Sequence, residues 1–300
     1  MSHPGWQELT FETTQPRVET LEEWLFAQGA VAVTLEDNAD EPLLEPGPGE
    51  TPLWQQVKVV ALFNEGMDLG PVVEAVPAEL VDTATPAPAH IPDQDWERAW
   101  MDNFHPMQMG ERLWICPSWI TPPYPEAVNI ILDPGLAFGT GTHPTTAMCL
   151  GSLDRHVAPG MRVIDFGCGT GILAIAALKL GAQHALAVDN DPQAITATKQ
   201  NAERNQVASA QLEIALPEDI AWAPIQESAD IVVANILAGP LEALAHQLKG
   251  LVKPGGGGRL ILAGLLSDQA KALVDVYAPE IELVVEQESE GWALLGGKRS

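Results

Sequence analysis

The chain has 300 residues, enough for one or two domains with a real core, and its apolar residues nowhere form the run of about 18 that a membrane span requires. Its formal net charge of −26 argues against nucleic acid as a partner, because such binding depends on lysine and arginine contacts to phosphate. The 3 cysteines are odd in number and lack C-x-x-C spacing, so we predict free thiols and no metal site. No secretory signal is expected either, and we therefore predict a cytoplasmic location.

The first 80 residues predict a small, acidic α+β domain of the ferredoxin-like type. The predicted elements are a strand over 6–12, a helix over 16–28, strands over 30–35 and 57–63, and a short helix over 69–76. This β-α-β-β-α order, completed by a strand near Ile91, is typical of that fold. None of these segments shows catalytic spacing.

Acidic residues are concentrated in this part of the chain. Residues 1–95 hold 18 Asp and Glu against Arg17 and Lys58, so −16 of the net charge of −26 lies there. Such a surface repels phosphate and attracts basic proteins. We therefore expect residues 1–80 to recognise a basic protein, although an acidic surface can also serve solubility alone.

A linker and a connecting helix are predicted over residues 81–105, ahead of a second domain over 106–300. Ala, Thr and Pro alternate up to Pro92, and the helix-like stretch after it carries Trp96 and Trp100, which we expect to pack between the domains. The glycine-rich stretch 130–141 then leads into a helical segment with Thr142 as its predicted N-cap. That loop is placed to close over a ligand.

A glycine-rich turn organises the second domain. Residues 161–171 read MRVIDFGCGTG, a buried strand that ends at Asp165 and runs into glycines at 167, 169 and 171. A helix over 172–180 and a second strand over 185–188 follow, and Asp189 ends that strand. A turn without Cβ atoms lets backbone approach a ligand, and a carboxylate at the next strand tip can bind both ribose hydroxyls. The sequence therefore predicts a nucleoside site.

The glycine spacing distinguishes between nucleoside ligands. Dinucleotide folds use G-x-G-x-x-G, whereas here the third glycine comes one position early and Ile172 stands in its place. The pattern D-x-G-x-G-x-G resembles the first motif of class I methyltransferases, which use S-adenosylmethionine. A nicotinamide-dependent oxidoreductase remains the alternative in another class.

The rest of the chain predicts a doubly wound α/β sheet of seven strands. Further strands are expected over 211–214, 231–234, 259–263, 281–285 and 292–295, and helices over 192–205, 241–251 and 267–277. The last two strands are joined by a short turn, so they must be antiparallel and give the sheet a reversed edge strand. Asn235 follows a buried strand at the edge where such sheets bind ligands; there its amide could accept a hydrogen bond from an amine while its NH₂ is held. A turn-forming asparagine is an equal alternative.

Four segments carry a resemblance to a known family. LDPGLAFGTGTHPTT, VIDFGCGTGILAIAALKLGA, DNDPQAI and VVANILAGPL follow one another after a small first domain. In that order they resemble the bacterial methyltransferases that modify large-subunit ribosomal protein eleven. The similarity runs from about Trp96 to the C-terminus and more loosely through residues 1–95. It implies a class I, Rossmann-like methyltransferase domain behind a substrate-recognition domain.

The resemblance also implies an activity and a set of residues. Methyl groups would pass from S-adenosylmethionine to lysine side chains and the N-terminal α-amine of the free, basic ribosomal protein. Neither direct nucleic-acid binding nor membrane binding is expected. The residues expected to bind the donor are Thr146, Asp165, Gly167, Gly169, Asp189 and Asn235. Asn235 would orient the acceptor nitrogen, and His143 could accept a proton or simply stand beside a helix start.

Other functions stay open at this point. The same chemistry could act on another protein, on a small-molecule amine or on nucleic acid, although NILAGPL differs from the N-P-P-[Y/F/W] motif of base and glutamine methyltransferases. A catalytically inactive assembly protein that keeps the methyltransferase fold is a further alternative.

Overall fold

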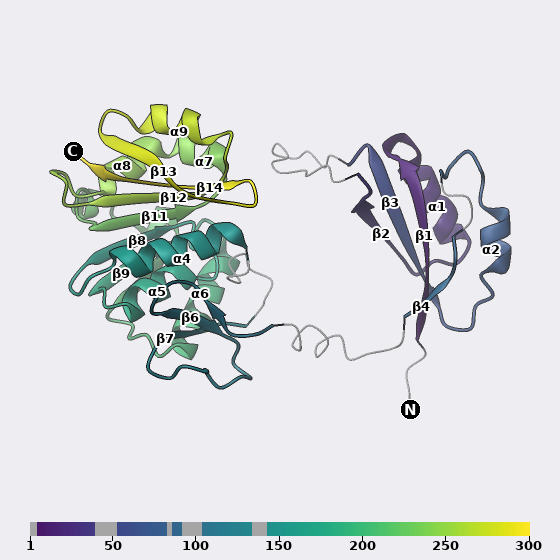
Figure 1. Ribbon diagram of the computed structural model, residues 1–300, viewed down its shortest axis with the longest axis horizontal. Coiled ribbons are helices and arrows are strands. Elements are labelled where there is room, and N and C mark those ends of the chain that lie inside the picture. Colours follow the sequence, from purple (N-terminus) through teal and green to yellow (C-terminus); the bar gives the residue numbers. More distant parts are fainter. Residues whose placement is uncertain (1–4, 40–52, 83–85, 92–103, 134–142) are drawn as a thin grey trace. The chain divides into compact units, whose positions relative to one another are not determined.

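The computed structural model describes residues 5–39, 53–82, 86–91, 104–133 and 143–300 (Figure 1). The chain divides into two compact units, Met1–Asn103 and Phe104–Ser300. Among the described helices, none is both long enough and apolar enough to cross a membrane.

The first unit is a four-stranded antiparallel sheet with two helices. Its elements are β1 (Trp6–Thr14), the 3₁₀ turn η1 (Gln15–Arg17), α1 (Val18–Ala27), β2 (Ala32–Asp37), β3 (Gln56–Asn64), α2 (Gly70–Ala75) and β4 (Ala89–Ile91). The strands lie in the order β2-β3-β1-β4. This arrangement matches the ferredoxin-like prediction.

The core of this unit lies between one face of the sheet and its helices. Every second residue of β3 is buried, and Leu9 and Phe11 of β1 are buried beside them, as strand alternation requires. Val18, Leu21 and Leu25 supply the apolar stripe of α1. Gly29 ends this helix with a φ of 96°, the left-handed conformation that glycine adopts readily.

The predicted boundary at residue 80 is too early. Residues Ala89 to Ile91 pair with β1 in the register Glu8↔Ala89 to Trp6↔Ile91, so they belong to the first sheet. The strand expected near Ile91 is thus present as β4, and it extends the first sheet past residue 80.

The second unit is built on a seven-stranded sheet. Its strands are β8 (Arg162–Phe166), β9 (His184–Val188), β10 (Leu212–Ala215), β11 (Ile231–Asn235), β12 (Arg259–Leu266), β13 (Ile281–Ser289) and β14 (Trp292–Arg299). They lie in the order β10-β9-β8-β11-β12-β14-β13. This order confirms the predicted class I methyltransferase sheet, but the reversed strand β14 lies one place in from the edge, which β13 occupies.

Helices cover both faces of this sheet (Figure 1). The helices are α4 (Pro144–His156), α5 (Ile172–Lys179), α6 (Pro192–Arg204), α7 (Ala238–Ala243), α8 (Ala245–Leu251) and α9 (Ala270–Tyr277), with 3₁₀ turns η3 (Pro217–Asp219) and η4 (Ala223–Ile225). The first three helices share one apolar cluster with the sheet, and the last three share the other. The strands between these clusters are buried on both faces, as a mostly parallel sheet requires.

Two further differences from the sequence expectation concern local structure. The helix expected over 241–251 is two helices that meet at Leu244, and no residue type marks this break. A small sheet of β5 (Met107–Gln108), β6 (Leu113–Cys116) and β7 (Val128–Ile131) was not predicted. Its strands are too short to show alternation, and β6 pairs with β7 in parallel across a long connection.

Several predicted features lie outside the described residues. They are the connecting helix with Trp96 and Trp100, and the glycine-rich segment over 134–142.

Candidate active site at the carboxyl edge of the sheet

The glycine turn after β8 requires its glycines for two reasons. Gly167, Gly169 and Gly171 have φ angles of 78°, 53° and 75°, in the left-handed region that disfavours residues with a Cβ. Space is also absent, because a Cβ on Gly167 would lie 2.2 Å from Cγ2 of Ile236. The turn therefore presents backbone where most sequences would present side chains.

Asp189 ties this turn to the tip of β9. Its Oδ2 accepts a hydrogen bond from the Gly169 N–H at 2.8 Å, and its Oδ1 accepts from the Asp191 N–H at 3.0 Å. Each carboxylate oxygen has two lone pairs, so both can still accept a hydroxyl. The geometry is thus compatible with a ribose at this position.

Two side chains of α6 hold the turn from behind. Thr198 donates its hydroxyl to the Gly169 carbonyl at 3.0 Å, and Asn201 donates from Nδ2 to the Thr170 carbonyl at 2.9 Å. Sequence reasoning missed both residues. The sequence pattern that could have identified them is a pair of polar residues three positions apart, on the buried helix face that also carries Ala194 and Ala202.

Asp165 lies completely buried beneath the turn. Its Oδ2 accepts from the Ala174 N–H at 3.0 Å, while its Oδ1 has no partner among the described residues. Burial raises the pKa of this carboxyl to about 7, the Ala174 N–H opposes the shift, and nearby Asp189 adds to it. Asp165 therefore supports the first turn of α5 and is only partly ionised at neutral pH.

Asn235 is the last residue of β11, and among the described residues only the NH₂ group of its side-chain amide has a hydrogen-bond partner. Its Nδ2 donates to Oγ1 of Thr146 at 3.3 Å, and Thr146 is buried in the first turn of α4. Its Oδ1 is buried without a hydrogen-bond partner among the described residues. A buried carbonyl oxygen without a donor is rare, and it marks a place where a donor group of a substrate could bind.

The end of β11 also lies against the glycine turn. Ile236 fills the space beside Gly167, and its backbone oxygen would be 2.5 Å from a Cβ on Gly264 of β12. Gly264 has a φ of 86° and is therefore another position suited to glycine. Ile236, which follows Asn235, thus packs between Gly167 and Gly264 and brings Gly167 and Asn235 to the same edge of the sheet. The sequence had not indicated a role for Ile236 or Gly264.

His143 is the N-cap of α4, so the prediction of Thr142 as the cap was wrong by one residue. Its Nδ1 lies 3.3 Å from the Thr145 N and 2.7 Å from the Thr145 hydroxyl oxygen. The ring meets Trp292 of β14 edge-on, with centroids 5.0 Å apart. Burial lowers the pKa of His143, and the charge of Glu290 opposes that shift.

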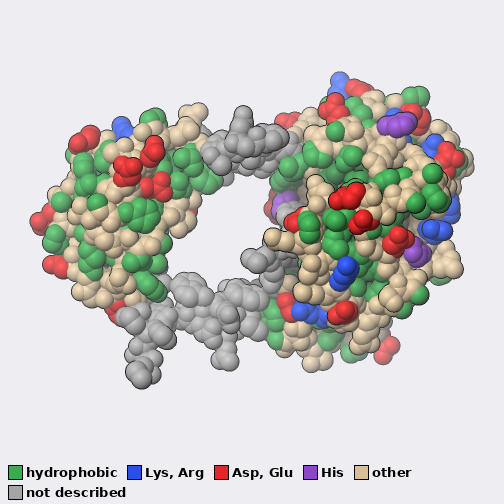
Figure 2. All heavy atoms as spheres, turned by 180° about the vertical axis from the view of Figure 1, so that it is seen from behind, with side chains coloured by type: hydrophobic (Ala, Val, Ile, Leu, Met, Phe, Trp, Pro, Cys, Tyr) green, Lys and Arg blue, Asp and Glu red, His purple; other side chains and the backbone are tan. Residues whose placement is uncertain are grey.

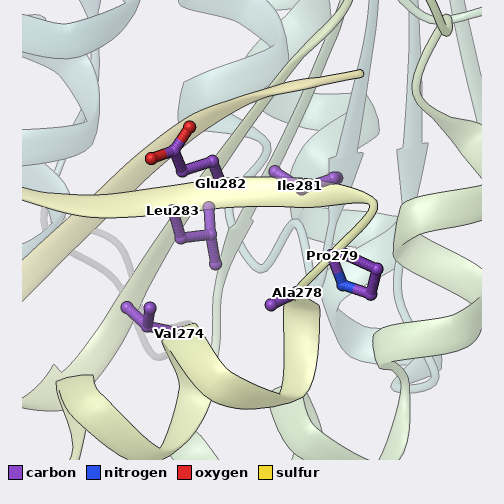
Figure 3. A pocket seen from close by; sticks show the side chains of 6 residues that line it. All are labelled: Val274, Ala278, Pro279, Ile281, Glu282 and Leu283. Carbon is purple, nitrogen blue, oxygen red and sulfur yellow. The ribbon is translucent and has the colours of Figure 1, made fainter.

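A separate hollow lies between α9 and β13 (Figure 3). Its volume is about 280 Å³, and Val274, Ala278 and Leu283 line it together with Pro279, Ile281 and Glu282. None of the predicted site residues borders it. It plays no part in the site described above.

Comparison with known proteins places the whole chain in one group. A family model described as ribosomal protein L11 methyltransferase (PrmA) matches residues 5–300. The ribosomal protein L11 methyltransferase of Shewanella sp. (strain ANA-3) is 51% identical over 296 residues, covering 98% of this chain and 99% of that protein. The corresponding protein of Pseudomonas paraeruginosa is 49% identical over 299 residues, covering 98% of each chain.

A solved structure agrees with these relatives. The crystal structure of ribosomal protein L11 methylase from Lactobacillus delbrueckii subsp. bulgaricus is 32% identical to this chain and aligns with a TM-score of 0.57. The alignment covers 66% of this chain and 100% of that one.

Proposed function

The chain belongs to the ribosomal protein L11 methyltransferase family, and from this premise we propose that it methylates amino groups of free ribosomal protein L11 with S-adenosylmethionine as the donor. The acceptors are lysine side chains and the N-terminal α-amine. Another protein or a small-molecule amine is the alternative acceptor.

The observation that carries this proposal is the amide of Asn235. Its NH₂ is held by Thr146, and its buried Oδ1 has no donor among the described residues. An amine nitrogen is a donor that suits this oxygen. An N–H···O bond to Oδ1 would leave the nitrogen lone pair free to point at a methyl group beside the glycine turn.

The residues of the turn fit the donor. Gly167 and Gly169 present backbone without side chains at the turn, and both oxygens of Asp189 keep a lone pair for the ribose hydroxyls. Thr146 and Asp165 border the same edge of the sheet. The donor supplies a methyl group already activated on a sulfonium, so the protein's tasks are alignment and a neutral acceptor.

Neutralising the acceptor is the larger electrostatic task. A lysine with a pKa of about 10.4 is almost fully protonated at pH 7, and removing its proton costs roughly 4–5 kcal/mol. Desolvation near the positive sulfonium lowers that pKa. Asn235 then orients the neutral amine through its carbonyl oxygen, which is uncharged and therefore favours the ammonium form less than a carboxylate would.

The first unit supplies the surface for a basic protein substrate. Residues 1–95 carry a formal charge of −16. On the face of this unit seen in Figure 2, the unit at left, acidic side chains outnumber basic ones. Such a field speeds association with a basic partner and repels RNA, which supports recognition of the free protein.

The test is methyl transfer from labelled S-adenosylmethionine to purified L11, with assembled ribosomes and a basic protein of similar size in parallel. We expect free L11 alone to gain mass in steps of ~14 Da, because differential acceptor binding defines specificity. Mapping by fragmentation then assigns each methyl group to a lysine or to the α-amine. Transfer to the control protein at the same rate would refute the L11 assignment, and methylated carboxyl or amide groups would refute the amine assignment.

A further inference from the structure

His143 is connected to Asn235 through the first turn of α4. We propose that His143 is a positioning residue rather than a base: its neutral ring caps α4 and so fixes Thr146, which holds the Asn235 amide. This inference rests on the proposed function, since Asn235 matters there as the group that orients the acceptor amine.

The cap depends on an unprotonated Nδ1. The Thr145 backbone N–H donates to this atom at 3.3 Å, and the Thr145 hydroxyl oxygen lies 2.7 Å from it. The helix begins at Pro144, which lacks an N–H, so the Thr145 N–H is the first donor of the helix that needs an acceptor. With the Nδ1 lone pair used in this way, the ring proton lies on Nε2. The ring then has no free lone pair to take a proton from an acceptor amine.

The next residue transmits the effect of the cap. Thr146 follows Thr145 in the same turn and accepts the bond from Asn235 at 3.3 Å, close to the longest distance at which a hydrogen bond persists. A shift of a few tenths of an ångström at the start of α4 therefore loosens the amide. Errors of about 1 Å in alignment cost on the order of a hundredfold in rate.

The surroundings of His143 favour the neutral ring. Burial lowers its pKa, and a positive charge at a helix N-terminus opposes the helix dipole. The negative charge of Glu290, in the turn between β13 and β14, opposes this effect and raises the pKa of His143. Arg259, Glu286 and Arg155 act instead on His156, at the far end of α4. Trp292, edge-on to the ring, supports its orientation without a charge.

Three variants separate a cap from a base. His143→Asn keeps a side-chain oxygen that can cap a helix and does not titrate, whereas His143→Ala removes the cap. His156→Asn is the matched control, because it removes a titratable ring from the other end of the same helix. We would measure single-turnover methyl transfer to L11 at saturating donor against pH, and donor affinity by calorimetry.

For a cap, His143→Ala should lower the rate about tenfold while donor affinity stays within about twofold, and His143→Asn should recover most of the loss. The acceptor amine alone gives one proton-linked step. The pH profile of the wild-type rate should show a second step on the acidic side, at a pH below the usual histidine pKa of about 6.5. This second step should be absent in His143→Asn and present in His156→Asn. A rate for His143→Asn as low as for His143→Ala, or a second step that survives in it, would overturn the positioning role.

A second readout does not require transfer. In the wild type the side-chain NH₂ resonances of Asn235 should shift as His143 titrates, and in His143→Asn they should stay fixed over the same pH range. Amide resonances that ignore the titration of His143 would overturn the connection. An enzyme that transfers nothing to L11 yet shows this coupling would instead refute the proposed function alone.

Discussion

The two sides of the site are built in different ways. The turn side consists of Asp165, Gly167, Gly169 and Asp189, and the side-chain hydrogen bonds of these residues join positions at most 29 apart. The amide side consists of Thr146 and Asn235, which are 89 positions apart. One βαβ unit forms the turn side, whereas the amide side exists only after β11 has taken its place beside β8.

This difference suggests a division of labour. The turn side offers backbone and carboxylate oxygens, which suit binding of a nucleoside donor. The amide side offers one oriented acceptor atom, which suits alignment of an amine. Changes on the turn side should therefore weaken donor binding, and changes on the amide side should slow transfer with little effect on donor affinity.

The largest effect is expected for Asp189→Ala. It removes the two oxygens proposed to bind the ribose and the bond that holds Gly169, and hydrogen bonds to a charged group contribute about 1.5–3 kcal/mol each. Donor affinity by calorimetry should fall at least a hundredfold. Asp191→Ala removes a neighbouring carboxylate that caps α6 and serves as the control. Normal donor affinity in Asp189→Ala would show that this carboxylate does not bind the donor.

Asn235→Ala should have the next largest effect, on rate rather than affinity. Without the carbonyl oxygen the amine loses its orienting contact, and single-turnover transfer should fall about a hundredfold. Donor affinity should change no more than about threefold. Asn129→Ala, which removes an amide from the small sheet, is the control for general destabilisation. An unchanged single-turnover rate for Asn235→Ala would remove Asn235 from the mechanism.

Thr146→Val should have a smaller effect of the same kind. The change keeps the side-chain shape and removes the oxygen that holds Asn235, which corresponds to about one hydrogen bond and a loss of roughly fivefold to tenfold in rate. Thr198→Val sharpens the comparison, because it frees the Gly169 carbonyl and should weaken donor binding instead. The division of labour fails if Thr146→Val weakens donor binding as much as it slows transfer.

The smallest effect concerns stability and the buried Asp165. Its pKa is raised from 3.8 to about 7, so the folded protein binds more protons than the unfolded chain between these values. Stability from this group is therefore complete below the unfolded pKa and is lost as pH rises through about 7. The Asp165→Asn side chain does not ionise and so does not lose this stability. The free energy of unfolding of Asp165→Asn minus that of the wild type should therefore be larger at about pH 8 than at about pH 5.

Denaturant unfolding at the two pH values would measure this change. Asp219→Asn, which removes an exposed carboxylate from η3, controls for the loss of a surface charge. A difference between Asp165→Asn and the wild type that is the same at both pH values would mean that Asp165 is ionised throughout.

The central strands of the second unit were predictable, because β8, β9 and β11 are apolar runs that end at or just before a glycine, an aspartate or an asparagine. Ile231–Asn235 and Arg162–Phe166 are examples. The strands of the small sheet were not predicted: they have four residues or fewer, and β6 and β7 pair in parallel across a long connection. The predicted start of α4 was close, but the N-cap is His143 rather than Thr142, because a histidine ring can accept a helix N–H as a hydroxyl does.

The amino-acid sequence by itself determined the glycine turn and the position of Asp189 on the following strand. Local conformation decides these features, because glycines at left-handed angles and one helix fix where the next strand begins. Tertiary structure alone decided that Thr146 holds the Asn235 NH₂ and leaves Oδ1 without a partner among the described residues. The order β8-β11-β12 sets that contact, and strand order depends on the burial of whole sheet faces, which no single segment encodes.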